Sequence, residues 1–300
     1  MGSRAIGRTG RGRCSATIAL RRQLRRAIAD LDAKAPVDDV CLHEVRKELK
    51  RARATLRLLR DSIGEMDYRR ANRRLRDAAR PLARVRDTKM LLGAVERLCG
   101  DTKKGPRQKE LASLEQGLRG ERQRARGQLK RSAALRRARR SVASVLSDSR
   151  PWPAATDASL RRGVERVYRK GRKTFARSEA QKREEALHES RKQTKYLAKA
   201  LEVLAAAGGG RRIAKPVKRA EAIAHALGEE HDLAMLRKKL VARSRLGSDR
   251  RALLTQIDHQ RRKLQRKAAK HGRRLYRRKP KAFVDALDLP GRLIEGDTAR

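Results

Sequence analysis

A nine-residue stretch, Leu-His-Glu-Val-Arg-Lys-Glu-Leu-Lys at residues 42–50, recurs 145 positions later as Leu-His-Glu-Ser-Arg-Lys-Gln-Thr-Lys at residues 187–195. The same offset aligns residues 85–91 with residues 230–236, so that Arg86-Asp87 corresponds to His231-Asp232. Because the register is kept between the two blocks, we interpret the pattern as an internal duplication. A repeated unit sets the unit of folding, and here that unit is about half of the chain.

The sequence predicts an all-α fold, because good helix formers dominate it and alternating β-branched stretches are almost absent. The expected helices cover residues 15–33, 39–62, 66–100 and 106–147 in the first half, and 157–178, 183–206, 211–243 and 248–287 in the second. Pro81 is expected to break or kink the third helix. Turns are expected at Met66-Asp67 and at Gly208–Gly210, which are equivalent places in the two halves.

These helices predict two pseudo-symmetric four-helix bundles, at residues 15–149 and 157–288, which share a basic central groove. Residues 150–156 contain Pro151, Trp152 and Pro153 and are expected to form a linker that cannot continue a helix. Residues 1–14 are expected to be a disordered basic tail, and residues 289–300 a C-terminal tail.

The charge of the chain indicates a polyanionic partner. Lys and Arg number 81 against 34 Asp and Glu, which gives a formal net charge of +47. Such a protein repels itself unless an anion compensates it. No apolar run is long enough for a membrane span, and the three cysteines show no metal-ligand spacing. We therefore expect a cytoplasmic protein.

Each repeated stretch places a row of cations on one helix face. At 100° per residue, the apolar residues Val45, Leu49 and Leu56 fall opposite His43. The first ladder consists of His43, Arg46, Lys47, Lys50, Arg51, Arg53 and Arg57. The second ladder consists of His188, Arg191, Lys192, Lys195 and Lys199. Two such faces in a pseudo-symmetric pair are expected to line the shared groove.

The duplicated His-x-x-Arg-Lys-x-x-Lys pattern, followed in each half by an aspartate before an apolar run, resembles the conserved histidine α-helical domain, CHAD, over residues 15–288. The resemblance implies two four-helix bundles around a basic cavity that binds inorganic polyphosphate, often on polyphosphate granules. His43, Arg46, Lys50, Arg51 and Arg53 match the family's first ladder, and His188, Arg191, Lys192 and Lys195 match its second. Because Tyr196 and Ala198 stand where the first ladder has Arg51 and Arg53, the second ladder is expected to be weaker.

Other residues receive looser assignments. The final helices supply possible further phosphate contacts at Arg122, Arg126, Lys130, Arg262, Arg266 and Lys270, and whether they face the groove is left open. Arg86-Asp87 is interpreted as an ion pair or helix cap. In the second half, Gly228 fits the glycine that the family often has before its Arg-Asp pair. His225, His259 and His271 have no counterpart in the other half and stay unassigned.

The resemblance to CHAD makes inorganic polyphosphate the expected partner, and rows of Arg and Lys donors suit a bare phosphate chain. No cofactor is expected. A zinc site is not expected, because Lys47 and Lys192 stand where the second histidine of a metalloprotease helix would be. No catalytic constellation is visible either, so we expect a binding protein and not an enzyme.

Two other kinds of partner remain open. The first is nonspecific binding of the DNA or RNA backbone, although aromatic residues make up 2% of the chain and supply few stacking platforms. The second is a scaffold that organises other proteins on a granule through its arginine-rich surface.

Overall fold

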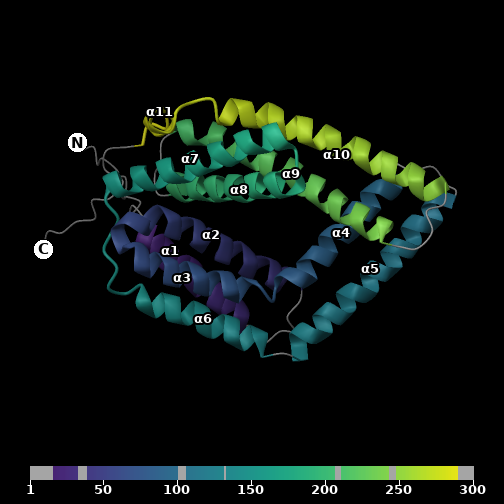
Figure 1. Ribbon diagram of the computed structural model, residues 1–300. Coiled ribbons are helices and arrows are strands. Elements are labelled where there is room, and N and C mark those ends of the chain that lie inside the picture. Colours follow the sequence, from purple (N-terminus) through teal and green to yellow (C-terminus); the bar gives the residue numbers. More distant parts are fainter. Residues whose placement is uncertain are drawn as a thin grey trace, which may run out of the picture.

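The computed structural model describes residues 16–32, 39–100, 106–131, 133–206, 211–242 and 248–289, and within them the chain forms helices and no strand. The first half contains α1 (Ala16–Asp32), α2 (Asp39–Ile63), α3 (Glu65–Ala79), α4 (Ala83–Gly100), α5 (Pro106–Arg131) and α6 (Ala134–Asp148). The second contains α7 (Asp157–Gln181), α8 (Glu184–Ala206), a short 3-10 helix (Arg211–Ile213), α9 (Ala214–Val241), α10 (Ser248–Leu275) and α11 (Pro280–Asp285) (Figure 1). The all-α prediction is confirmed.

Three breaks divide the long predicted helices, and only the one at Pro81 was expected from the sequence. Pro81 separates α3 from α4, as a residue without a backbone N–H does when it follows a helix. The predicted helix over 106–147 is two helices, since α5 ends at Arg131 and α6 begins at Ala134. The predicted helix over 248–287 ends at Leu275, and Pro280 then opens α11 at the position where proline fits a helix start.

The turn between α2 and α3 lies at Gly64 and not at Met66-Asp67, which belong to the first turn of α3. Gly64 has a φ of 84°, a backbone conformation that glycine adopts without strain. The counterpart turn at Gly208–Gly210 and the tail at residues 1–14 lie outside the described residues, as does the tail beyond residue 289.

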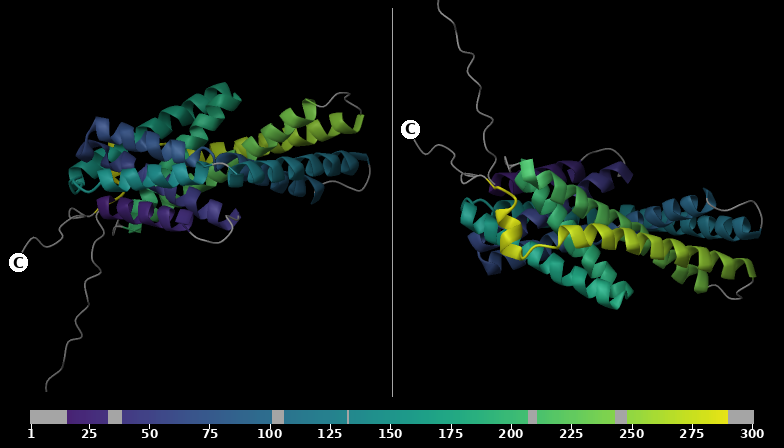
Figure 2. Two further views of the ribbon diagram at one scale, coloured as in Figure 1. Left: turned by 90° about the horizontal axis from the view of Figure 1, so that it is seen from below. Right: turned by 90° about the horizontal axis from the view of Figure 1, so that it is seen from above.

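Two hydrophobic clusters hold the helices together, and each takes residues from both halves of the sequence. The main core joins α1, α2, α3 and α6 to α7, α8, α11, the first part of α9 and the end of α10. The arm core joins α4 and α5 to the second part of α9 and the start of α10. The helices of the arm core extend away from the main body (Figure 2). The halves of the sequence are thus interlocked by two shared cores.

The apolar face of α2 is buried as its periodicity predicts. Val45, Leu49 and Leu56 have no exposed surface, which leaves the opposite face of α2 for the cations. On the main-core side, α2 crosses α7 so closely that a Cβ atom on Gly163 would lie 2.6 Å from the carbonyl oxygen of Leu58. This close crossing fixes the first half against the second.

The segment between the halves is also packed. Trp152 is 7% exposed and belongs to the main core, and the Thr156 side chain caps α7 by accepting a hydrogen bond from the Ser159 N–H at 3.2 Å. An aromatic cluster joins α7 to α11 and to the end of α10. The rings of Tyr168 and Phe283 stack with their centroids 3.8 Å apart, and the Tyr276 hydroxyl lies 3.0 Å from the Thr194 hydroxyl of α8. These contacts hold α8 with its second ladder turned toward α2 and α4.

Candidate functional site

A central pocket lies between α2, α4, α8 and α9 and has a volume of about 520 Å³. Its cationic lining consists of Lys50 and Arg53 from α2, Arg86 and Arg97 from α4, and Arg191, Lys192, Lys195 and Lys199 from α8. The remaining wall is α9, which contributes His225, Gly228, Glu229 and Asp232 among others. The two ladder helices therefore face the same space.

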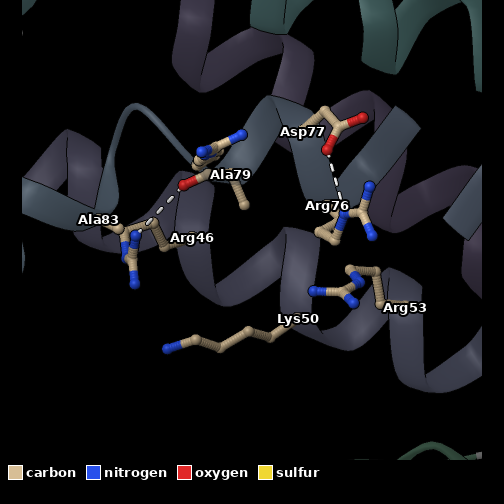
Figure 3. A pocket seen from close by; sticks show the side chains of 8 residues that line it. Arg46, Lys50, Arg53, Arg76, Asp77, Ala79 and Ala83 are labelled. Carbon is tan, nitrogen blue, oxygen red and sulfur yellow. Dashed lines mark hydrogen bonds and ion pairs between the residues drawn. The ribbon is translucent and has the colours of Figure 1, made fainter. Parts of the chain in front are cut away.

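A second pocket, of about 440 Å³, lies where Pro81 separates α3 from α4, and we call it the hinge pocket. Its lining adds Arg46, Arg76 and Arg80 to Lys50 and Arg53. Arg46 donates to the carbonyl oxygen of Ala79, a backbone acceptor that the end of α3 leaves available, at 3.4 Å. The Lys50 side chain lines this pocket as well as the central one, and Figure 3 shows no bond from it to the other labelled residues.

A third pocket, of about 330 Å³, lies between α2, α3, α7 and α8, and we call it the α7 pocket. Its lining includes Arg57, Arg60, Arg76, Arg166, Lys170 and Lys192. The Arg57 guanidinium lies 3.5 Å from the centre of the Tyr196 ring, a cation–π contact that orients both side chains. Arg53 lines all three pockets, so we treat them as one basic cleft that follows α2 from Arg46 to Arg60.

Lys50 and Lys195 are the cleft lysines whose charged forms are most strongly disfavoured. Within the described residues, no ion pair involves either of them. Desolvation in the pocket, together with repulsion from Arg86, Arg46 and Arg191, lowers the pKa of Lys50 to about 8. Desolvation, with repulsion from Arg191, Lys50 and Arg86, lowers the pKa of Lys195 to about 6. An anion in the cleft would relieve this repulsion, because a nearby opposite charge favours the protonated amine.

Arg191 packs closely over a glycine of the neighbouring helix α9. It is 7% exposed, and its guanidinium lies over Gly228, where a Cβ atom would be 3.4 Å from one of its terminal nitrogens. The Nε atom of Arg191 and the Oδ2 atom of Asp232 are both buried without a hydrogen-bond partner. Buried polar atoms are normally paired, so these two atoms are unsatisfied groups at this end of the cleft.

Two histidines stand beside Arg191. The rings of His188 and His231 are 5.1 Å apart. Burial and the neighbouring Arg191 lower the pKa of both imidazoles, that of His231 to about 4. Burial and the Arg191 charge therefore disfavour the charged form of both imidazoles in the free protein.

The predicted ladder residues do not all line the cleft. Those that do are Arg46, Lys50, Arg53, Arg57, His188, Arg191, Lys192, Lys195 and Lys199. His43 is exposed and lines none of the described pockets. Lys47 binds Glu44 and Arg51 binds the buried Glu48, each at 2.8 Å, so these two cations have a partner on their own helix. The second ladder, expected to be the weaker one, lines the central pocket along its whole length.

The candidate cations of the final helices lie elsewhere. Arg122 and Arg126 line a separate pocket on α5 and interact with Asp39 at the start of α2. The side chain of Lys130 lies outside the described residues. Arg262, Arg266 and Lys270 are exposed on α10 and line none of the described pockets.

Several cleft residues were not found by reasoning from the sequence. Arg76, Arg80 and Arg97 belong to no repeated motif, and their position depends on how α3 and α4 diverge at Pro81. Arg86 was interpreted only as the partner of Asp87; it forms that contact at 3.2 Å and also lines the central pocket. His225, which was left unassigned, lines the same pocket. The match of Arg86 to the repeat was the one signal that pointed to the cleft.

The described residues contain no group of three or more His, Cys, Asp or Glu side chains placed to hold a metal ion. None of the described helices is both long enough and apolar enough to cross a membrane.

Comparisons with known proteins agree with this architecture. A family model described as CHAD domain matches residues 18–241. The fold is similar to the crystal structure of the CHAD domain from the plant Ricinus communis, with a TM-score of 0.56 and 18% identity, covering 96% of this chain and 96% of that one. It is also similar to PptA from Streptomyces chartreusis, with a TM-score of 0.62 and 17% identity, covering 88% of this chain and 99% of that one. A search of curated proteins found no match.

Proposed function

This chain belongs to the CHAD domain family, and from that premise we propose that it binds inorganic polyphosphate in the basic cleft. The observation that carries the proposal is the meeting of both ladder helices at one continuous cationic surface, in which Lys50 and Lys195 lack an ionic partner among the described residues. A linear chain of phosphates suits a surface of this kind, because it presents charge at every unit and nothing else to recognise.

The geometry of α2 supplies the spacing. Arg46, Lys50, Arg53, Arg57 and Arg60 recur at intervals of three or four residues and line the cleft, so they span about 21 Å along one helix face. The arginines offer paired N–H donors to phosphate oxygens, and the lysines add compact point charges. Release of counterions should supply much of the affinity, which will therefore fall steeply as salt is raised.

Binding without catalysis is part of this proposal. Its support is the lining of the central pocket, where cations outnumber carboxylates and Glu229 already interacts with Arg97 and His225. Association with polyphosphate granules in the cell would follow from the same affinity. Incubation with long-chain polyphosphate should release no phosphate, and steady release would contradict this part of the proposal.

The test is a competition combined with two matched variants. Labelled long-chain polyphosphate is titrated at physiological salt and then challenged with duplex DNA, RNA and inorganic phosphate in excess of charge. In the cleft variant, Lys50→Glu and Lys195→Glu remove two contacts. The control variant carries Lys263→Glu and Lys267→Glu, which make the same change in net charge on exposed residues of α10 that line none of the described pockets.

Loss of two charge-assisted contacts should weaken polyphosphate binding about a hundredfold or more, and the control variant should bind within about threefold of the native chain. Equal weakening in the two variants would show that net charge alone attracts the polymer, and the cleft model would be wrong. Helix content, measured by circular dichroism, should be the same in all three proteins.

A specific observation keeps nucleic-acid backbone as a second candidate partner. The outer face of α10 and the residues after it expose Arg262, Lys263, Arg266, Lys267, Lys270, Arg273, Arg274, Arg277, Arg278, Lys279 and Lys281. Surfaces of this kind attract phosphate backbones without reading sequence. If duplex DNA binds the native chain, and the control variant with Lys263→Glu and Lys267→Glu loses DNA binding while the cleft variant keeps it, this face is the site of nucleic-acid binding.

A further inference from the structure

Lys195 has the environment of a reactive amine. It lines the central pocket beside Arg191, Lys50 and Arg86, whose repulsion outweighs the attraction of the Asp232 carboxylate in the same pocket, and no ion pair with a carboxylate reaches it within the described residues. A half-buried ammonium surrounded by cations is disfavoured relative to the neutral amine. Lysines that are desolvated and lie next to other cationic groups act as nucleophiles in proteins for this reason.

The same pocket holds the groups that bind a phosphate. Arg191 from α8 and Arg86 from α4 both line this pocket, and each guanidinium can donate hydrogen bonds to phosphate oxygens. A small molecule that carries both a phosphate and an electrophilic carbon would be fixed by its phosphate next to the amine. Fixing the two reactants in this way removes much of the entropic barrier to their reaction.

We propose that Lys195 is a site of acylation by small acyl phosphates, with the cleft holding the phosphate group while the Lys195 amine attacks the acyl carbon. The nitrogen lone pair forms an amide bond to the carbonyl carbon, and the bond from that carbon to the phosphate oxygen breaks. Inorganic phosphate leaves with the electron pair, and the amine nitrogen releases one proton to solvent. No oxidant, reductant or further reactant is needed.

Acylation would alter the cleft in a lasting way. An amide nitrogen is not protonated at any pH near neutrality, so the acylated side chain cannot take up the proton that a bound polyanion favours, and the cleft binds a polyanion less tightly. Bound polyphosphate has the opposite effect on the reaction, because it occupies the phosphate site and favours the protonated, unreactive amine. The two ligands therefore exclude one another, and the state of Lys195 links binding to the supply of acyl phosphate.

The inference rests on the proposed function in one respect, which is that both need the cleft to hold a phosphate group. The experiment uses the native full-length chain, with acetyl phosphate as the probe. The rate of acetylation at each lysine is followed by peptide mass spectrometry from pH 6 to pH 9, with and without long-chain polyphosphate. Lys263 and Lys267, exposed on α10, are internal controls in the same sample.

A parallel reaction with p-nitrophenyl acetate, which lacks a phosphate, separates the effect of the depressed amine pKa from the effect of phosphate binding. A depressed pKa favours Lys195 with either reagent, and phosphate binding favours it with acetyl phosphate alone. At pH 7.5 the neutral fraction of an amine with a pKa of about 6 exceeds that of an ordinary lysine about a thousandfold. Part of this advantage is offset because a weaker base is a weaker nucleophile.

We expect Lys195 to react with acetyl phosphate at least about tenfold faster than Lys263 and Lys267 at pH 7.5. Its rate should level off above about pH 7, whereas the rates at the exposed lysines keep rising. Polyphosphate should suppress labelling at Lys195 and leave the rates at Lys263 and Lys267 unchanged.

Labelling of Lys195 at the rate of the exposed lysines would overturn the inference, whether or not polyphosphate binds in the same sample. A preference for Lys195 with p-nitrophenyl acetate that acetyl phosphate does not increase would also overturn it, because the phosphate would then play no part. Fast labelling by acetyl phosphate with no binding of polyphosphate would support the acylation site and overturn the proposed function instead.

Discussion

Binding of polyphosphate should be accompanied by the uptake of about one proton at pH 7.5. In the free protein, desolvation and repulsion from neighbouring cations lower the pKa of Lys195 to about 6 and that of Lys50 to about 8. At pH 7.5, Lys195 is therefore nearly uncharged and Lys50 is about three-quarters charged. A polyanion in the cleft restores both amines toward the ordinary pKa of about 10.4, so Lys195 takes up almost a whole proton and Lys50 about a quarter.

The sign of the pH dependence follows from linkage. Because the bound state holds more protons than the free state, affinity falls as pH rises. One proton taken up corresponds to about a tenfold loss of affinity for each pH unit near pH 7.5, or about 1.4 kcal/mol. Below about pH 6 the contribution of Lys195 should fade, because its amine is then already charged in the free protein.

Isothermal titration calorimetry measures this uptake directly. The titration is repeated at pH 7.5 in two buffers of very different ionisation enthalpy, and the difference in binding enthalpy gives the number of protons exchanged. The control is Lys195→Met, which keeps the length of the side chain and removes the titrating group. In that variant uptake should fall to about a quarter of a proton, the share of Lys50. A binding enthalpy that is the same in both buffers for the native chain would refute the reasoning.

The remaining predictions concern the histidines and the stability of the fold. His188→Gln should weaken polyphosphate binding more at pH 6 than at pH 8. A bound anion favours the protonated form of this imidazole, and that form is populated only when the pH is near or below the imidazole pKa. His43 is exposed and lies outside the described pockets, so His43→Gln should leave polyphosphate affinity unchanged at pH 6 and at pH 8. Binding titrations at these two pH values compare the two histidine variants. The free energy of unfolding of the free protein should rise with pH above about 6, because unfolded Lys195 binds a proton that the folded amine has lost. Lys195→Met should flatten that rise in thermal melts, and an equal slope in both proteins would show that Lys195 does not cause it. Gly163→Ala should lower the free energy of unfolding by about 1–2 kcal/mol, because overpacking against the α2 backbone exceeds the gain in helix propensity. At Gly120 only the flexible end of Arg124 lies near, so Gly120→Ala should instead raise the free energy of unfolding by up to about 1 kcal/mol. Denaturant unfolding of the two variants measures both changes. A Gly163→Ala variant more stable than the native chain would mean that the α2–α7 crossing is loosely packed.

Sequence reasoning predicted the helices better than their ends. Local periodicity and composition were enough to locate the long helices, including α2 with its buried Val45, Leu49 and Leu56. The break after Arg131 was missed because no proline or glycine marks it. The end of α10 was missed because Pro280 stands five residues beyond Leu275, where the basic run of the sequence continues without interruption.

The candidate site was predicted in its main outline and missed in its detail. The repeat pointed to α2 and α8, and these are the helices that line the central pocket. Arg76, Arg80 and Arg97 were out of reach, because they enter the cleft from α3 and α4 and only the change of direction at Pro81 brings them there. A repeat reveals residues that two copies share, and these arginines occur in one copy only.

The sequence by itself determined the helical class, the excess of cations and the two helix faces on which repeated cations lie, because each of these depends on residue type and spacing along one chain. Only the tertiary structure decided which cations share a site. Lys47 and Lys50 lie on the same face of α2, yet Glu44 binds Lys47 outside the described pockets, while Lys50 faces the helices of the second half. The physical reason is that a cationic helix face is wider than the cleft it borders, and the packing of α4, α8 and α9 against α2 decides which part of that face is enclosed.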